Sequence, residues 1–318
     1  MEKYDLLYKP EKADECFNVK EILKRRLSVS ARLLRRLKYG GGVSRNGLPA
    51  KMNDKVVAGD ILTVAFPSEG SGFEPEPIPI SVVYEDSDLL VIDKQAGLVV
   101  HPTKGHPAHT VANGLTYRMA ESGEHFKIRF INRLDMDTTG LLVVGKNAYS
   151  QQDFARQSAE NRVVKRYEAV VVGLVEPEEG VIELPIRKED DAGLRRVVRP
   201  DGAHSVTRYR VLERFGCGRG HTLLSLMLDT GRTHQIRVHL SYIGHAVAGD
   251  ALYGGESPLL IDRQALHAAE LAFSHPRTKK MLRFTAPLPE DMKNLLEYLR
   301  ALCDNAGDGH TKNAFAEV

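Results

Sequence analysis

One short polar segment of the sequence carries residues that could do chemistry. It runs from Phe130 to Val144 and places Arg133, Asp135 and Asp137 between two apolar runs. The apolar runs predict strands, so the polar residues lie in a loop at a strand–loop–strand junction, and such loops expose side chains into clefts. A carboxylate there is ionised at neutral pH and can act as a nucleophile or as a general base. The sequence leaves these two roles open.

Two further segments carry groups that a carboxylate site would use. A β-rich run contains Tyr167, and a later segment contains Arg237. The later segment fits either a strand or a helix. We expect a helix, with Thr230 or Thr233 capping its start and Gly244 suiting its end.

Metal and paired-carboxylate sites fit the spacing less well. Two groups of histidines lie close together: His101, His106 and His109, and then His234 and His239. A separation of five residues puts neither pair on one helical face, and no cysteine completes a tetrahedral set. Asp135 and Asp137 would point to opposite faces of a strand, unlike the paired carboxylates of a glycosidase or a metal-dependent nuclease. We therefore expect no metal.

The composition is that of a globular protein. The chain has 318 residues, 42% of them hydrophobic and 27% charged, so it can bury a full core and is long enough for two domains. Extensive disorder, collagen and coiled coil are excluded. No apolar run reaches the roughly 20 residues of a membrane helix, and no secretory signal opens the chain, so we expect a cytoplasmic protein. Three scattered cysteines predict neither a disulfide framework nor a zinc site.

Basic residues are concentrated near the N-terminus. Residues 20–55 hold eleven basic and two acidic side chains, a charge of +9; because the whole chain carries +2, the remainder carries −7. This asymmetry favours a small module that grips a polyanion and a larger body that acts on it, with a basic face that binds nothing as the alternative. The candidate RNA-binding residues in the module are Lys24, Arg32, Arg35, Arg36 and Lys38.

The basic module has its own pattern of elements. An amphipathic helix is predicted over residues 19–27, followed by a second helix capped by Ser28 or Ser30 and ended by glycines. Asn46-Gly47 predicts a two-residue hairpin turn, and residues 61–66 predict a closing strand. A helical hairpin that binds protein is the alternative interpretation.

Composition also divides the chain into four parts. Residues 1–66 form the module, and the Pro-, Gly- and Glu-rich stretch 67–80 predicts a flexible linker. Residues 81–303 interleave short strands and helices without a βαβ period, which favours an α+β fold, and residues 304–318 predict a disordered tail.

Several segments together resemble a known family. They are KQAGLVVHP (residues 94–102), NRLDMDTTGLLVV (132–144), KRYEAVV (165–171), TGRTHQIRVHL (230–240), GHAVAGDALYG (244–254) and LHAAELAFSHP (266–276). In this order they resemble pseudouridine synthases of the RluA class, the large-subunit ribosomal RNA branch. Residues 16–66 resemble the S-four-like RNA-binding module of one small-subunit ribosomal protein and of tyrosyl-tRNA synthetases. Asn132 and Gln95 depart from the family's usual His and Pro.

The resemblance implies an isomerase that converts uridine to pseudouridine in structured RNA, with large-subunit ribosomal RNA as the expected partner. It implies a mixed, mostly antiparallel sheet, no cofactor, no membrane and a monomer. Asp135 would react, Arg237 would orient it, Tyr167 would stack on the base, and Arg133 would fill the gap left by a flipped uridine.

Each role has a plainer alternative. Asp135 could cap its own loop, Arg237 could form a structural ion pair, Tyr167 could be a core residue, and Arg133 could form a surface salt bridge. For the whole chain, the alternatives are a non-catalytic RNA-binding or ribosome-assembly factor, for which Asn132 and Gln95 are the support, and an enzyme that hydrolyses a glycosidic bond.

Overall fold

The computed structural model describes residues 5–190, 193–255 and 261–307. The N-terminal elements are β1 (Leu6–Tyr8), the short 3-10 helix η1 (Lys12–Asp14), α1 (Val19–Arg25), α2 (Ala31–Gly40), β2 (Val43–Arg45), β3 (Leu48–Pro49) and β4 (Leu62–Val64). The four strands form an antiparallel sheet in the order β1-β4-β2-β3. Helices α1 and α2 bury their leucines against it, in a hydrophobic cluster separate from that of the body.

The predicted elements of this region are confirmed in type. Ser30, rather than Ser28, caps α2 by accepting the Leu33 N–H at 3.2 Å. Asn46 and Gly47 both have positive φ, of 54° and 80°, as a two-residue hairpin turn requires. Strand β1 was not predicted, because three residues are too few to show an alternating pattern.

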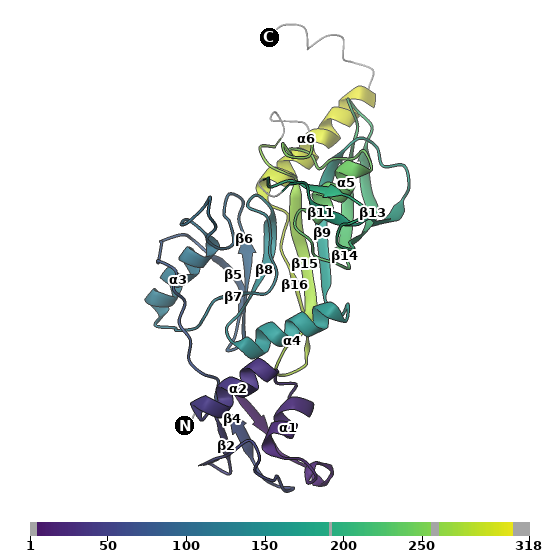
Figure 1. Cartoon of the computed structure of the whole chain (residues 1–318). Helices are drawn as coiled ribbons and strands as arrows, with labels where there is room; N and C mark the ends of the chain where they lie inside the picture. Colours follow the sequence, from purple (N-terminus) through teal and green to yellow (C-terminus); the bar gives the residue numbers. More distant parts are fainter. Residues whose placement is uncertain (1–4, 191–192, 256–260, 308–318) are drawn as a thin grey trace.

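A mixed sheet of ten strands forms the body (Figure 1). Its main path runs β10-β13-β14-β9-β15-β8-β6-β5, with β16 added on β15 and β7 on β8. The strands are β5 (Ser81–Glu85), β6 (Leu89–Lys94), β7 (Arg129–Phe130), β8 (Thr139–Gly145), β9 (Val164–Val172), β10 (Glu179–Glu183), β13 (Val206–Phe215), β14 (His221–Leu228), β15 (Leu266–Ser274) and β16 (Met281–Thr285). A separate hairpin joins β11 (Ile186–Lys188) to β12 (Arg196–Val198).

Every strand pairing in the large sheet is antiparallel except that of β8 with β15. This confirms the α+β prediction and the mostly antiparallel sheet. At the parallel contact, Gly140 has φ +106°, and a Cβ there would lie 2.3 Å from the Ala268 carbonyl oxygen. Only glycine allows the two strands to approach so closely directly after the loop that carries Asp135.

Four helices flank the sheet: α3 (Val111–Ser122), α4 (Ala148–Ala159), α5 (Gln235–Tyr242) and α6 (Glu290–Gly307). Figure 1 shows α4 lying across the end of the sheet nearest the N-terminal elements, whereas α5 and α6 lie at the other end. Helix α6 continues to Gly307, so the prediction that a disordered tail starts at residue 304 is wrong for residues 304–307. The reason is that Leu299 and Cys303, one helical turn apart, still pack on the core. Residues 308–318 of that tail lie outside the described residues.

Helix α4 joins the N-terminal elements to the body. Tyr149 is buried in the N-terminal hydrophobic cluster, and its ring stacks on Phe66 with 5.8 Å between ring centroids. The Gln152 amide accepts the Ser30 N–H at 2.8 Å and donates to the Ser28 carbonyl at 2.6 Å. These contacts come from both apolar and polar groups, so the two parts share a packed joint.

The stretch 67–80, predicted to be a flexible linker, contains no helix or strand but is held against the body. The Ser71 hydroxyl accepts the Ile128 N–H at 2.7 Å, and the Asn113 side chain donates to the Glu74 carbonyl at 2.8 Å. Ile78 is buried in the core of the body. In the part of the chain that the structure describes, no helix is long and apolar enough to span a membrane.

Candidate active site

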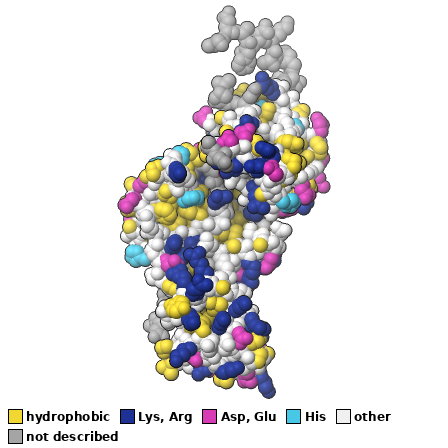
Figure 2. Space-filling model, viewed as in Figure 1, with side chains coloured by type: hydrophobic (Ala, Val, Ile, Leu, Met, Phe, Trp, Pro, Cys, Tyr) yellow, Lys and Arg dark blue, Asp and Glu magenta, His cyan; other side chains and the backbone are white. Residues whose placement is uncertain are grey.

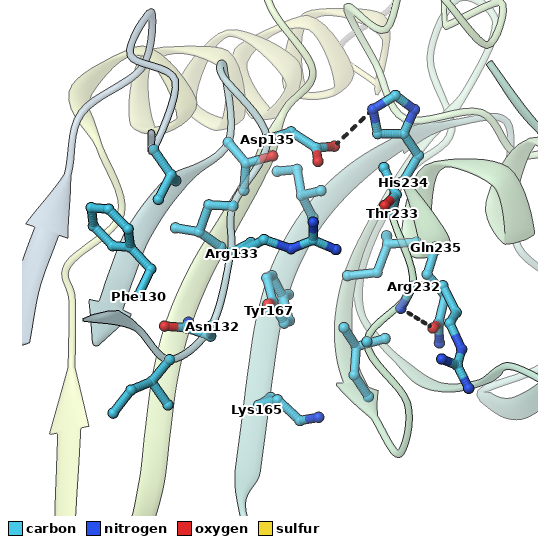
Figure 3. A pocket seen from close by; sticks show the side chains of 18 of the residues that line it. Phe130, Asn132, Arg133, Asp135, Lys165, Tyr167, Arg232, Thr233, His234 and Gln235 are labelled. Carbon is cyan, nitrogen blue, oxygen red and sulfur yellow. Dashed lines mark hydrogen bonds and ion pairs between the residues drawn. The ribbon is translucent and has the colours of Figure 1, made fainter. Parts of the chain in front are cut away.

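A cavity of about 510 Å³ lies beside strands β9, β14 and β15 of the large sheet. The β7–β8 loop, strand β9 and the segment that leads into α5 all contribute to its lining. Figure 3 shows Arg133 and Asp135 approaching the cavity from the loop, Tyr167 from the strand, and His234 from the start of the helix. The predicted strand–loop–strand junction, the strand with Tyr167 and the helix with Arg237 are therefore confirmed as elements that meet at one place.

Asp135 presents its carboxylate to the cavity. Its side chain is 24% exposed, and Oδ2 accepts a hydrogen bond from Arg237 Nη1 at 3.0 Å. The Thr138 N–H donates to the Asp135 backbone carbonyl, and among the described residues no backbone N–H donates to the carboxylate. The carboxylate is therefore not a cap of its own loop.

Arg237 connects this carboxylate to a second one. Its guanidinium donates from Nε and Nη2 to Asp250 at 2.7 and 2.8 Å, and from Nη1 to Asp135. The Asp250 side chain is fully buried and that of Arg237 is 8% exposed. Burial would lower the pKa of Arg237, but the hydrogen bonds and charge of Asp250, together with those of Asp135, hold that pKa above its ordinary value. Arg237 is thus a buried ion-pair residue, and its third hydrogen bond goes to Asp135.

Asp250 was missed by the sequence analysis, although it lies in one of the segments that carry the family resemblance. Its only sequence signal is its place after Gly249, in a turn. Tyr253 was missed as well: its ring lies 5.1 Å from the Arg237 guanidinium, and its hydroxyl lies 2.9 Å from His234 Nδ1. Both residues come from the turn that follows α5, so this turn completes the surroundings of Arg237.

Helix α5 begins differently from the prediction. Neither Thr230 nor Thr233 caps it: His234 occupies the cap position with φ 56° and makes no capping side-chain bond. The Thr230 hydroxyl instead donates to Gln235 Oε1 at 2.8 Å and accepts the Val206 N–H at 2.9 Å, so it is already engaged. Gly244, with φ 86°, follows the helix end as predicted.

Tyr167 forms part of the cavity wall and part of the core. It is 8% exposed and belongs to the main hydrophobic cluster of the body. Burial, with the nearby Asp135 charge, raises the pKa of its hydroxyl, which stays protonated at neutral pH. The core interpretation of Tyr167 therefore agrees with its packing, and the same residue also lines the cavity.

Arg133 and Lys165 are two of the cations that line the cavity. Arg133 is exposed and directed into the cavity, and among the described residues it forms no ion pair, so the surface salt bridge considered for it is not found. Lys165, which the sequence analysis did not single out, is half-buried at the base of the cavity. Burial lowers its pKa, and the more distant Asp229 charge opposes this.

Lys94 fixes the Asp135 loop from behind. It is 1% exposed, and its ammonium donates to the carbonyl oxygens of Gln95, Leu98 and Met136 at 2.8, 2.9 and 2.7 Å. Met136 directly follows Asp135, so this bond ties the loop to the end of β6. Burial lowers the pKa of Lys94 to about 8. The sequence predicted no role for this residue.

Comparisons with known proteins decide the family. The family model described as RNA pseudouridylate synthase matches residues 88–242. The protein named "Uncharacterized RNA pseudouridine synthase YlyB", of Bacillus subtilis (strain 168), is 42% identical over 264 residues, which cover 82% of this chain and 86% of that protein. The chain belongs to the RNA pseudouridine synthase family. The resemblance carried by the motifs is thereby confirmed, as is the enzyme class, an isomerase that acts on RNA.

Two further relatives of this synthase agree. "Ribosomal large subunit pseudouridine synthase D" of Vibrio cholerae serotype O1 is 39% identical over 275 residues, which cover 82% of this chain and 84% of that protein. The solved structure "Human RNA Pseudouridylate Synthase Domain Containing 1" is 28% identical, with a TM-score of 0.55 over 72% of this chain and 98% of that one.

The two departures from the family pattern do not disturb the contact between Asp135 and Arg237. Asn132 accepts the Val143 N–H at 2.7 Å and donates to the Leu141 carbonyl at 3.1 Å, which fastens the start of the loop to β8. Gln95 donates to the Pro79 carbonyl at 3.0 Å. Neither side chain bonds Asp135 or Arg237, so the synthase keeps its carboxylate and guanidinium, and the non-catalytic alternative loses its support.

One group of residues in the described part of the chain has the spacing of metal ligands: Asp86, Asp88 and His275. None of the three lines the cavity. Arg277 donates two hydrogen bonds to Asp88, at 2.7 and 2.8 Å, while His275 and the Tyr84 hydroxyl each bond Asp86. These contacts make the group an ion-pair cluster of the body.

We predict that the buried Lys94 makes stability depend on pH above neutrality. Its pKa is about 8 in the folded synthase, against 10.5 for an ordinary lysine, so the folded chain binds fewer protons between these values. The contribution of Lys94 to the free energy of unfolding therefore increases, and favours the folded state more, as pH rises from about 8 to about 10.5. Urea unfolding of wild type and Lys94→Met across this range should show the stability difference moving in favour of wild type. A difference that stays constant with pH would contradict the lowered pKa.

We further predict that Asp250→Asn slows the reaction without releasing RNA. The amide keeps the shape of the side chain but removes the charge that holds Arg237, so the Asp135 carboxylate loses its alignment. The single-turnover rate should fall by up to about a hundredfold, while the Kd for RNA is unchanged. Glu213→Gln, which breaks a surface pair with Arg300, is the matched control and should keep the wild-type rate. A wild-type rate in Asp250→Asn would rule out this role.

Proposed function

We propose that this synthase isomerises uridine to pseudouridine in large-subunit ribosomal RNA, with Asp135 as the reacting residue. The observation that carries the proposal is a partly exposed carboxylate, held by a buried guanidinium, at the wall of a cavity large enough for a flipped nucleotide. The substrate class is supported by relatives of about 40% identity that are named ribosomal large subunit pseudouridine synthases.

The reaction needs positioning more than it needs new chemical groups. The bond from uracil N1 to the sugar C1′ breaks and a bond from C5 to C1′ forms, while C5 loses a proton and N1 gains one. Atoms and electrons balance without an oxidant or a cofactor. Asp135 would attack the sugar or take a proton from it, and Arg237 would hold the carboxylate in place through its hydrogen bond to Oδ2.

The other cavity residues would hold the flipped uridine. The Tyr167 ring offers a flat surface for the base, a contact on the order of 1–3 kcal/mol. Arg133, which has no protein counter-ion among the described residues, would occupy the gap in the RNA stack or neutralise a phosphate. The uridine that is selected depends on RNA shape rather than on a residue code.

Residues 1–66 would serve as an S-four-like RNA grip. Figure 2 shows Lys and Arg side chains gathered where the N-terminal elements meet the body and again beside the hollow above. Lys24, Arg32, Arg35 and Lys38 are exposed, whereas Arg36 pairs with Glu69 at 2.8 Å. We assign the connection to residues 67–80 and the body to residues 81–307, as far as the end of α6. A monomer that works in the cytoplasm, where ribosomal RNA is available, fits this assignment.

The reaction and its substrate are tested together by mapping pseudouridine in total RNA. Cells that lack the gene would be complemented with wild type or with Asp135→Asn, which keeps the side-chain shape but removes the charge. We expect at least one ribosomal RNA position to lose pseudouridine in the deletion and to regain it only with wild type. Restoration by Asp135→Asn would remove Asp135 from the chemistry, and an unaltered map in the deletion would contradict the proposed substrate.

We predict that neutralising α2 weakens RNA binding in a salt-dependent way. Changing Arg32, Arg35 and Lys38 to Gln removes three exposed cations, and each lost phosphate contact should reduce the slope of log K against log salt by about 0.7–0.9. Filter binding at several salt concentrations would measure the slope. The matched control changes the exposed Lys280, Arg283 and Lys293 of the body. Equal slopes in the two triple variants would contradict an RNA grip on α2.

A further inference from the structure

His234 occupies a strained position at the edge of the active site. Its φ of 56° places it in the left-handed region, which non-glycine residues rarely adopt, and Asn is the side chain best suited to it. It does not cap α5, and its side chain is 14% exposed and lines the cavity. A strained residue that serves neither the helix nor the core points to a task for its side chain.

Tyr253 determines which nitrogen of this imidazole carries the proton. The Tyr253 hydroxyl oxygen accepts the Arg196 N–H at 2.8 Å and lies 2.9 Å from His234 Nδ1. Among the described residues, no other acceptor lies within hydrogen-bond distance for the hydroxyl proton, so the hydroxyl donates to Nδ1. The neutral imidazole then carries its own proton on Nε2.

Nε2 faces the reacting carboxylate. It lies 3.9 Å from Asp135 Oδ2, the same oxygen that Arg237 Nη1 holds at 3.0 Å (Figure 3). This separation is longer than a hydrogen bond, but donor–acceptor pairs in sites without substrate commonly tighten when substrate binds. No donor among the described residues bonds Asp135 Oδ1, so that oxygen is left for the substrate.

The charges around the ring favour the neutral imidazole. Burial lowers the pKa of His234; Asp135 on the β7–β8 loop opposes this, while Arg237 on α5 and Arg196 on β12 add to it. Asp250, in the turn after α5, raises the pKa slightly. A neutral ring still donates from Nε2, so the contact to Asp135 does not require a charged histidine.

We propose that His234 is a positioning residue for Asp135: its Nε2–H, aligned by Tyr253, keeps Oδ2 turned toward Arg237 and thereby presents Oδ1 to the uridine. This inference rests on the proposed role of Asp135. His234 would be a second donor to the carboxylate, after Arg237. Tyr253 would align His234, and the N–H of Arg196 on β12 would in turn hold the Tyr253 hydroxyl.

Two variants of His234 separate this role from a structural one. His234→Gln places an amide donor near the position of Nε2, whereas His234→Asn places one only near Nδ1 but suits the left-handed backbone better. A structural role therefore favours Asn, and a positioning role favours Gln. Thermal unfolding should show Asn at least as stable as Gln in either case.

The measurement is single-turnover pseudouridine formation, with the Kd for RNA determined separately. We expect His234→Gln to stay within about threefold of the wild-type rate and His234→Asn to fall at least about tenfold, with both Kd values unchanged. Equal rates for the two variants, or losses that follow the Kd, would overturn the proposal. Asp135→Asn, assayed in parallel, keeps the outcomes distinct: activity there defeats the proposed function, whereas an inactive Asp135→Asn with a fully active His234→Asn defeats only this inference.

The proton position has a test of its own. Nitrogen NMR of histidine-labelled synthase should show His234 with a bare Nδ1 and a protonated Nε2 at neutral pH. The Tyr253→Phe variant should broaden or shift this signal, because the ring loses its fixed partner. A protonated Nδ1 in the wild-type protein would overturn the alignment by Tyr253.

Discussion

The site depends on one buried guanidinium shared by two carboxylates. Arg237 donates two hydrogen bonds to the fully buried Asp250 and one to the partly exposed Asp135. The guanidinium and the two carboxylates together carry one net negative charge, and Asp135 is the member of this group that lines the cavity. A planar donor fork fixes the direction of both acceptors, which an ammonium could not do. Without Arg237, the fully buried Asp250 carboxylate would keep the N–H groups of Leu252 and Tyr253 as partners but, among the described residues, would have no counter-ion, which is a costly arrangement. The position of the Asp135 carboxylate is therefore set by an ion pair within the protein.

The sheet brings the two carboxylates within reach of that cation. Strands β8 and β15 run parallel and touch at Gly140, which places the end of the Asp135 loop against the strand that follows the Asp250 turn. Lys94 then fastens the loop through the Met136 carbonyl, so it cannot swing into the cavity. Such rigidity favours catalysis, because prearranged charge and orientation lower the barrier of a reaction.

Local patterns in the sequence predicted the elements, and long-range pairing decided the rest. Apolar runs were enough to predict the strand that carries Tyr167 and the loop that carries Asp135. For the segment with Arg237, periodicity fitted both a strand and a helix, and signals at its two ends favoured the helix that is found. The partners of Arg237 leave no local signal, since Asp135 is 102 residues away and Asp250 lies in a short turn. The predicted cap of α5 was wrong for a similar reason: the Thr230 hydroxyl is bonded to Val206, a residue on a distant strand. The role of Asp135 itself came from family resemblance, which carries information that periodicity does not.

Composition alone could not predict the structure of the connection between the basic module and the body. A stretch rich in Pro, Gly and Glu makes few hydrogen bonds of its own, which is why it predicts a free tether. Here the body supplies the missing partners, and Glu69 links Arg36 of α2 to the buried Arg129 of β7. Two guanidiniums on one carboxylate leave a net positive charge at this joint. Phosphate groups would complement that charge, so the joint continues the basic surface that we propose as an RNA-binding region from the module onto the body.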